Sequence, residues 1–318
     1  MSDRVIQVNA PTRLHCGLLS VHGPGNRFGG AGLMVNEPGL QLTIRAAECF
    51  ETTGPLSERV RPFVDSWMKF SAIRDWPACR IAIERITPAH VGLGTGTQLG
   101  LAIAAGLNRW LGLPKLEWTA LAASVGRGLR SAIGTYGFHQ GGFLVERGKA
   151  PDEPLSPLDC RLDIPTDWRF VLIRPTQGEG LSGDAEHSVF ATNGSDKEAI
   201  SQQLREELRL RMVPAMARGD FESFSESLYA FGHRSGLLFS KEQGGPYNGP
   251  VLQGLVELTH KLGVQGIAQS SWGPTLFAVV PNHAAAIEFE RSLIRHAPTP
   301  LATCIATPNN AGASIEER

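Results

Sequence analysis

The chain has 318 residues, which is enough to bury a large core, and its length is typical of two domains. Hydrophobic residues make up 42% of the sequence and charged residues 19%, the balance of an ordinary soluble globular protein. The formal net charge of −1 gives no general attraction for nucleic acid or for a membrane surface. An anionic ligand would therefore have to be held by local arginines and backbone amides.

Cysteine usage and terminal composition predict a cytoplasmic protein. The five cysteines are far apart and contain no C-x-x-C pair, which argues against a disulfide framework or a structural zinc. The N-terminus lacks a basic region followed by an apolar one, and no run of 18 apolar residues exists, so we expect neither a signal peptide nor a membrane span.

The first segments of the chain alternate like β-strands. Residues 4–9 predict one strand, ended by Pro11, and residues 13–21 predict a second. On a period of two, Arg13, His15 and Gly17 share one face. That face is either turned to solvent or part of a site. A turn-rich stretch around Arg27 follows, and then a strand at 40–45, a helix at 57–70 and a strand at 79–86.

A glycine-rich loop at 88–97 leads into a helix. Gly92, Gly94 and Gly96 allow a tight turn, and Thr95 or Thr97 can cap a helix that ends near residue 112. A helix start carries unpaired N–H groups and partial positive charge, which suit a phosphate. The loop is neither a Walker A sequence nor a G-x-G-x-x-G fingerprint, so phosphate binding and a plain tight turn both remain open.

The rest of the chain divides near a proline-rich, acidic segment at 148–167. Before it we expect a helix at 116–125, an irregular glycine-dense run at 126–142 and a strand at 143–146. The predicted domains are thus 1–160 and 161–318. The second domain is predicted to contain strands at 168–175 and 301–306, an apolar strand after the polar turn at 266–275, and helices at 197–217, 220–238, 250–262 and 284–296.

Three separated segments resemble the GHMP small-molecule kinases: the N-terminal strand motif, the glycine loop and a glycine-rich C-terminal motif. The resemblance implies an α/β (α+β) protein, with an N-terminal domain of the ribosomal S5 domain 2-like type and a C-terminal ferredoxin-like domain. Two departures argue against kinase chemistry. Gly96 replaces a serine of the kinase loop, and Gly134 stands where many of these kinases carry an aspartate base.

A closer resemblance covers nearly the whole chain. The segments 13–18, 27–32, 90–98 and 134–143, together with Gln-Ser-Ser-Trp-Gly-Pro-Thr at 269–275, resemble the β-ribofuranosylaminobenzene 5′-phosphate synthase family. Cys16 departs from that pattern and should affect packing more than chemistry. The resemblance implies a pentosyltransferase of tetrahydromethanopterin biosynthesis. It would join phosphoribosyl pyrophosphate to 4-aminobenzoate or 4-hydroxybenzoate, release pyrophosphate and CO2, and use Mg²⁺. A homodimer would be usual for related enzymes.

Such a reaction needs anion binding, orientation and electrostatic stabilisation more than a nucleophilic side chain. We assign Arg27, His15 and Arg130 to catalysis. Phosphate and substrate binding is assigned to Arg13, Gly92, Gly94, Thr95, Gly96, Thr97, Gln98, Thr135, His139, Gln269, Ser270, Ser271 and Trp272.

Each assignment has a structural alternative. The arginines could be solvated surface charges, the histidines structural, the threonines only caps, and Trp272 core filler. The metal ligands are not predicted. An acidic loop holding Glu179, Asp184 and Glu186 could bind Mg²⁺, although a solvated loop is the simpler interpretation. The rival functions are an ATP-dependent kinase and a non-enzymatic phosphometabolite-binding protein.

Overall fold

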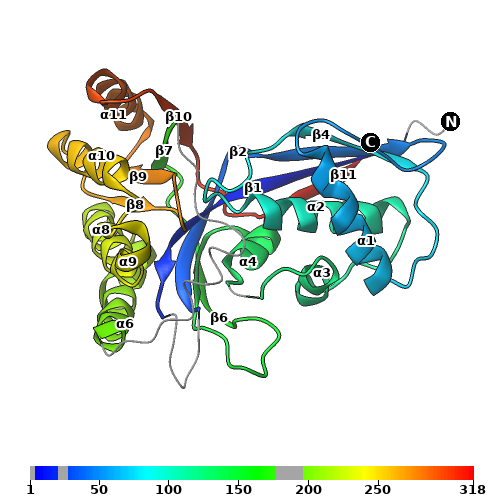
Figure 1. Cartoon of the computed structure of the whole chain (residues 1–318), viewed down its shortest axis with the longest axis horizontal. Coiled ribbons are helices and arrows are strands. Elements are labelled where there is room, and N and C mark those ends of the chain that lie inside the picture. Colours follow the sequence, from blue (N-terminus) through cyan, green and yellow to red (C-terminus); the bar gives the residue numbers. More distant parts are fainter. Residues whose placement is uncertain (1–3, 21–27, 130, 177–195) are drawn as a thin grey trace.

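The chain folds around two β-sheets (Figure 1). The structure is a computed structural model that describes residues 4–20, 28–129, 131–176 and 196–318. The first sheet is built on a long antiparallel pair, β1 (Val5–Leu18) and β2 (Gly30–Ala46). Its order is β11-β1-β2-β4-β3, and a side branch of β5 and then β6 pairs with the beginning of β2. The remaining strands are β3 (Glu51–Thr53), β4 (Cys79–Arg85), β5 (Phe143–Glu146), β6 (Leu158–Leu162) and β11 (Ser314–Glu317).

Helices cover one face of this sheet with their apolar sides. Buried residues of β1, β2 and β4 form one core cluster with those of α1 (Val60–Phe70), which follows a short 3-10 turn, and of α2 (Thr95–Trp110). Two further helices, α3 (Trp118–Ser124) and α4 (Ile133–Gln140), complete this layer. The sheet and its helices thus fix the position where α2 begins.

The second sheet has the strand order β10-β7-β9-β8. In chain order this reads 4-1-3-2, with helices between the first and second strands and between the third and fourth, which is the ferredoxin-like arrangement. The strands are β7 (Arg169–Pro175), β8 (Ile267–Gln269), β9 (Leu276–Val280) and β10 (Leu301–Ala306). The helices are α6 (Asp196–Glu207), a π-turn (Leu208–Met212), α7 (Val213–Arg218), α8 (Phe221–Leu237), α9 (Ser240–Gln243), α10 (Pro250–Lys261) and α11 (His283–His296).

The two units share a hydrophobic core. One buried cluster joins Leu14 and Leu33 of the first sheet to Phe224 and Phe231 of α8 and to Phe277 of β9. The last strand, β11, also returns to the first sheet and pairs with β1. The division at residues 160 and 161 stays a prediction.

Most predicted helices and strands are confirmed, and three predictions are wrong. β1 is one strand that continues through Pro11, because the proline lies at a register irregularity between Ala10 and Thr12. The glycine-dense run is not wholly irregular, since it contains α4. A Cβ added to Gly137 would lie 2.2 Å from the sulfur of Met34, so this glycine lets α4 pack closely on β2.

The third wrong prediction concerns the cap of α2. The cap residue is Gly94, with φ of 72°, and no side chain makes a cap hydrogen bond there. The Thr95 hydroxyl instead pairs with the Thr87 hydroxyl at 2.5 Å and with the carbonyl of Pro88 at 3.0 Å.

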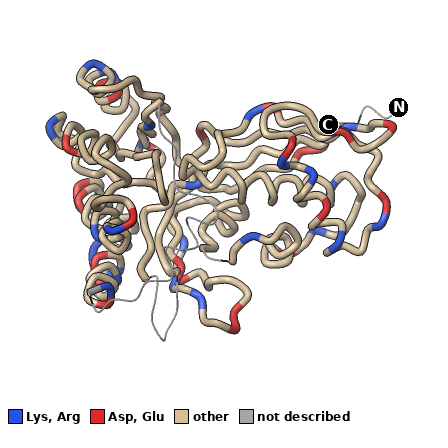
Figure 2. Tube along the Cα trace, viewed as in Figure 1, with Lys and Arg blue, Asp and Glu red and all other residues tan. Residues whose placement is uncertain are grey.

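Charged residues are distributed over both units with the two signs mixed (Figure 2). Within the described part of the chain, no helix is long and apolar enough to span a bilayer.

Candidate active site

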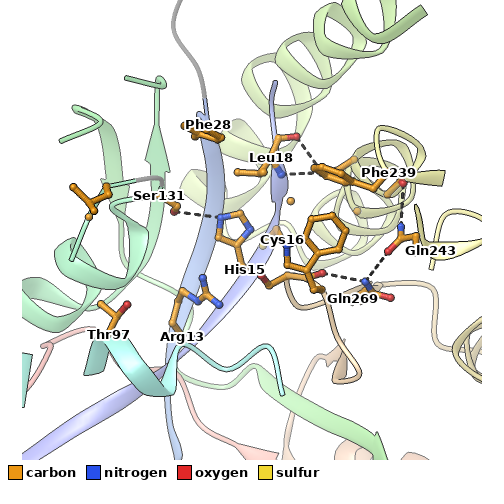
Figure 3. A pocket seen from close by; sticks show the side chains of 18 of the residues that line it. Arg13, His15, Cys16, Leu18, Phe28, Thr97, Ser131, Phe239, Gln243 and Gln269 are labelled. Atoms are coloured by element: carbon orange, nitrogen blue, oxygen red, sulfur yellow. Dashed lines mark hydrogen bonds between the residues drawn. The ribbon is translucent and has the colours of Figure 1, made fainter. Parts of the chain in front are cut away.

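A pocket of about 390 Å³ lies where β1, the loop after α3, helices α8 and α9, and the turn after β8 come together (Figure 3). Six of the predicted site residues line it, from three separate segments of the chain. They are Arg13, His15, Thr97, Gln269, Ser271 and Trp272. Three of the sequence segments that carried the family resemblance therefore meet at one cavity.

The glycine loop is tied to β1 through Arg13. The Arg13 Nη2 atom donates to the Gly92 carbonyl at 3.1 Å, and the Arg13 amide donates to the Leu93 carbonyl at 3.3 Å. A Cβ on Gly94 would lie 3.0 Å from Arg13 Cβ, so the loop passes directly over this side chain. The contact brings a guanidinium to the N-terminus of a 16-residue helix.

Two further arginines reach the same helix end. A Cβ on Gly96 would lie 3.4 Å from Nη2 of Arg127 and 3.5 Å from Nη2 of Arg59. Together with Arg13 they place three guanidinium groups around the start of α2, where the helix dipole is also positive. Positive charges gathered at a helix N-terminus favour binding of an anion. A phosphate can accept hydrogen bonds both from the guanidinium groups and from the backbone amides at the helix start.

Sequence reasoning missed Arg59 and Arg127. Arg59 lies just before α1 and carries no motif, so only the fold reveals it. Arg127 lies inside the glycine-dense run between α3 and α4, where a cation among turn residues could have drawn attention. Its guanidinium also rests over the ring of Phe63, 4.9 Å from the centroid, which holds it in place.

The turn after β8 fastens the second unit to the glycine loop. Ser270 is fully buried, and its hydroxyl accepts from the His15 amide at 3.0 Å and donates to the Gly92 carbonyl at 2.7 Å. The Thr275 hydroxyl donates to the Val91 carbonyl at 2.6 Å. Ser270, predicted to contact substrate, thus uses its hydroxyl to hold the glycine loop against β1.

The opposite side of the pocket is aromatic. Trp272 is 7% exposed and meets the ring of Phe239 edge to face at 4.7 Å. Beside them, the Gln269 amide donates to Gln243 and to the Ser271 carbonyl, and its oxygen accepts from the Asn248 amide at 2.7 Å. An apolar surface of two tilted rings with a fixed amide next to it suits an aromatic ring bearing polar substituents.

Two buried titratable groups form part of the pocket wall, with His15 lining the pocket and Glu146 behind it. Burial, with Arg13 nearby, lowers the pKa of His15 from 6.5 to about 3, so its ring is neutral at pH 7. A neutral ring can still donate or accept a hydrogen bond, and the assignment of His15 to catalysis stays a prediction. Burial raises the pKa of Glu146, at the end of β5, from 4.5 to about 7. Sequence reasoning missed Glu146, although an acid ending the apolar strand 143–146 is unusual.

Several predicted residues are not brought into this pocket. The Thr95 hydroxyl donates to the Pro88 carbonyl. Gln98 is buried, and its side-chain amide donates to the Gly134 carbonyl at 2.9 Å. Thr135 and His139 line a different cavity, of about 610 Å³, beside α3 and β11. Arg27 and Arg130, and the acidic loop with Glu179, Asp184 and Glu186, lie outside the described residues.

Neither a catalytic carboxylate at position 134 nor a metal cluster is present in the described site. A Cβ on Gly134 would lie only 3.2 Å from the Thr97 methyl group, so an acidic side chain would be crowded there. Among the described residues, no group of three or more His, Cys, Asp or Glu side chains could hold a metal ion. The donors around α2 are arginines and amides, which suit anions, so these residues do not themselves fit Mg²⁺.

Two protein-family profiles match the chain. "GHMP kinases N terminal domain" matches residues 61–139, and "GHMP kinases C terminal" matches residues 212–299. Homoserine kinase from Cytophaga hutchinsonii superposes with a TM-score of 0.72 over 99% of this chain and 98% of that one, at 19% identity. Mevalonate diphosphate decarboxylase from Staphylococcus aureus gives 0.68 over 98% of each chain, at 13% identity. The chain has the two-domain GHMP fold.

Relatives with a named activity narrow the assignment. The beta-ribofuranosylphenol 5′-phosphate synthase of Methanothermobacter thermautotrophicus is 29% identical over 86% of this chain and 88% of that protein. The Archaeoglobus fulgidus protein of the same name is 28% identical over 98% of this chain and 100% of its own length. The chain belongs to the GHMP superfamily and is similar over most of its length to the beta-ribofuranosylphenol 5′-phosphate synthases, which implies an enzyme with small-molecule substrates.

Proposed function

We propose that the protein transfers the phosphoribosyl group of phosphoribosyl pyrophosphate to 4-hydroxybenzoate, releasing pyrophosphate and CO2, as a step of tetrahydromethanopterin biosynthesis. The observation that carries the proposal is one pocket with a cationic helix end on one side and an aromatic wall on the other. Of the two acceptors considered, the relatives' name, which specifies a phenol product, favours 4-hydroxybenzoate over 4-aminobenzoate.

The arginine side of the pocket would stabilise the leaving group. Departure of pyrophosphate leaves positive charge on the ribose and gathers negative charge on the diphosphate. Arg13, Arg59 and Arg127, with the first amides of α2, are positioned to bind that charge as it develops. Guanidinium forks that are already assembled avoid the cost of reorganising water around the departing anion.

The aromatic side would orient the acceptor. With its ring against Trp272 and Phe239, the ring carbon that bears the carboxylate can attack C1 of the ribose. Loss of CO2 then restores aromaticity and leaves a carbon–carbon glycosidic bond. No protein nucleophile is required in this sequence of steps.

Mg²⁺ is retained as a proposed companion of the substrate's pyrophosphate. Because the described site supplies no cluster of metal ligands, the ion would be bound mainly by the diphosphate oxygens. No step above depends on a protein-bound metal. A homodimer and a cytoplasmic location also remain proposals.

The decisive experiment is product analysis. The protein is incubated with Mg²⁺, phosphoribosyl pyrophosphate and either benzoate, and CO2, pyrophosphate and product mass are measured. CO2 release that depends on both substrates supports the transferase. A phosphorylated product formed only with ATP would support the kinase alternative, and binding of phosphoribosyl pyrophosphate without release of pyrophosphate would support a binding protein.

A further inference from the structure

The pocket wall between β1 and α4 contains a cluster that the mechanism above does not use. His15 and Ser131 both line the pocket, and His15 Nε2 lies 3.4 Å from Ser131 Oγ (Figure 3). Behind them Glu146 is fully buried, and its Oε2 accepts from the Ala132 amide at 2.7 Å. Ser131 thus stands between a pocket-lining histidine and a buried carboxyl group.

The second oxygen of Glu146 is unusual. Oε1 is buried and makes no hydrogen bond with the described residues, although the Ser131 and Ser156 hydroxyls lie close enough to lower the pKa of the carboxyl. A buried acceptor without a hydrogen bond is costly and calls for an explanation. A carboxyl that takes up and returns a proton during the reaction provides one.

The proposed chemistry has a proton to place. The phenol of 4-hydroxybenzoate attacks best as its phenolate, whose electron density reaches the ring carbon bearing the carboxylate. Once CO2 has left, the phenolate oxygen must regain its proton. One group beside the pocket that accepts the proton of the phenol and later returns it to the phenolate would close this proton balance.

We propose that Glu146 and Ser131 form this proton relay and that His15 orients the Ser131 hydroxyl. The inference rests on the proposed function. As the phenol O–H bond breaks, its proton passes to Ser131 Oγ, and the hydroxyl proton of Ser131 passes to the Glu146 carboxylate. Pyrophosphate then leaves C1 of the ribose, the ring carbon bonds to C1, and the bond from that ring carbon to the carboxylate breaks. The bonding electrons return to the phenolate, which recovers the proton by the reverse path.

The electrostatic setting supports a reversible acceptor. Burial raises the pKa of Glu146 to about 7, and the Ser131 hydroxyl, Ala132 amide, Ser156 hydroxyl and the charge of Arg13 oppose that rise. His15, which like Arg13 lies on β1, remains neutral. The pKa of Tyr136 on α4 is raised, mainly by burial, and the charge of Glu146 raises it further. A base with a pKa near the working pH transfers protons well in both directions.

The test compares acceptors, because an amine needs no deprotonation to donate its electrons. With 4-hydroxybenzoate, Glu146→Gln should lower kcat by about 100-fold and remove the rise in activity with pH through about 7. With 4-aminobenzoate the same variant should lose less than about 3-fold. A 4-hydroxybenzoate carrying two ring fluorines, already ionised at neutral pH, should restore most of the lost rate.

Controls separate the possible failures. Ser131→Ala removes the hydroxyl of the relay at a half-buried position. Its loss of rate should depend on the acceptor in the same way as that of Glu146→Gln. Glu84→Gln makes the same chemical change on β4, away from the pocket, and should leave both rates unchanged. Equal losses with the phenol, amine and fluorinated acceptors would overturn the relay. A wild-type protein that makes no product from any acceptor would instead overturn the proposed function.

Discussion

The two sides of the pocket stabilise charge in opposite ways. Around the start of α2, Arg13, Arg59 and Arg127 bring permanent positive charge to a helix end that is already positive. On the other side, His15 of β1 and Glu146 behind it are titratable but buried deeply enough that burial sets their pKa values. The first side is built to hold an anion of several charges, and the second can change its charge by a single proton.

The difference fits a reaction with two unequal electrostatic tasks. Holding a diphosphate requires cations that never lose their charge, which arginine provides. Moving a single proton requires groups whose charge can change at little cost. Variants of the first side should therefore act on pyrophosphate binding and departure, whereas variants of the second should act through pH and acceptor chemistry.

The largest effect is expected from Arg127→Gln, which removes one guanidinium from the helix end. We expect kcat/KM for phosphoribosyl pyrophosphate to fall by about 100- to 1,000-fold, because a preorganised donor to developing charge is lost. Pyrophosphate release measured against substrate concentration gives the value. Arg80→Gln on β4, which removes an exposed arginine paired with Glu51, should change it little. A normal kcat/KM in the Arg127 variant would contradict the anion site.

Stability against pH should separate the two buried groups. The folded pKa of His15 is depressed, so its contribution is present above pH 6.5 and is lost as the pH falls toward 3. The folded pKa of Glu146 is raised, so its contribution is present below pH 4.5 and is lost as the pH rises through about 7. Between pH 5 and 7 the two effects oppose each other in the wild-type protein.

Glu146→Gln should therefore expose the His15 effect alone. The free energy of unfolding of this variant should fall by about 2 kcal/mol from pH 7 to pH 5, beyond any change in the wild-type protein. Urea unfolding at a series of pH values measures both curves. Parallel curves would mean that Glu146 does not titrate in this range.

The sequence made the glycine loop of the anion site much easier to predict than the arginines around it. Glycines at 92, 94 and 96, followed by an apolar pattern of helical spacing, predict a tight turn and a helix start from local sequence alone. The fold confirms both. Arg59 lies some 35 residues before this loop, and only the packing of α1 beside α2 brings its guanidinium to Gly96. Such contacts depend on tertiary structure, which no local pattern encodes.

Glu146 and α4 were missed for related reasons. Glycine density is normally read as irregular backbone, but in α4 the glycines serve close approach to β2, as at Gly137 against Met34. Alternation places Glu146 on a strand without revealing that helix α4 and the segment after β5 seal it from water. Its titration near neutrality is a consequence of that burial, so it could not be read from composition.

A smaller effect is expected from Trp272→Phe, which shortens the aromatic wall but keeps a ring. The KM for the benzoate should rise by about 10-fold, since part of the stacking area and its edge contact with Phe239 are lost. The KM for phosphoribosyl pyrophosphate should be nearly unchanged. Steady-state kinetics with each substrate varied in turn measures both values, and an equal rise in the two would show that the tryptophan supports the whole pocket rather than the acceptor.

The smallest effect should come from His139→Ala. Sequence reasoning placed His139 among the substrate-binding residues, but it lines the cavity beside α3 and β11 and not the pocket lined by Arg13 and Arg127. We therefore expect kcat/KM for both substrates to stay within about 2-fold of the wild-type value, because a side chain outside the pocket of Arg13 and Trp272 makes no contact with substrates bound there. The same steady-state assay measures it. A loss above about 10-fold would mean that substrate extends past α4, and the arginine-lined helix end would then hold only part of the phosphoribosyl group.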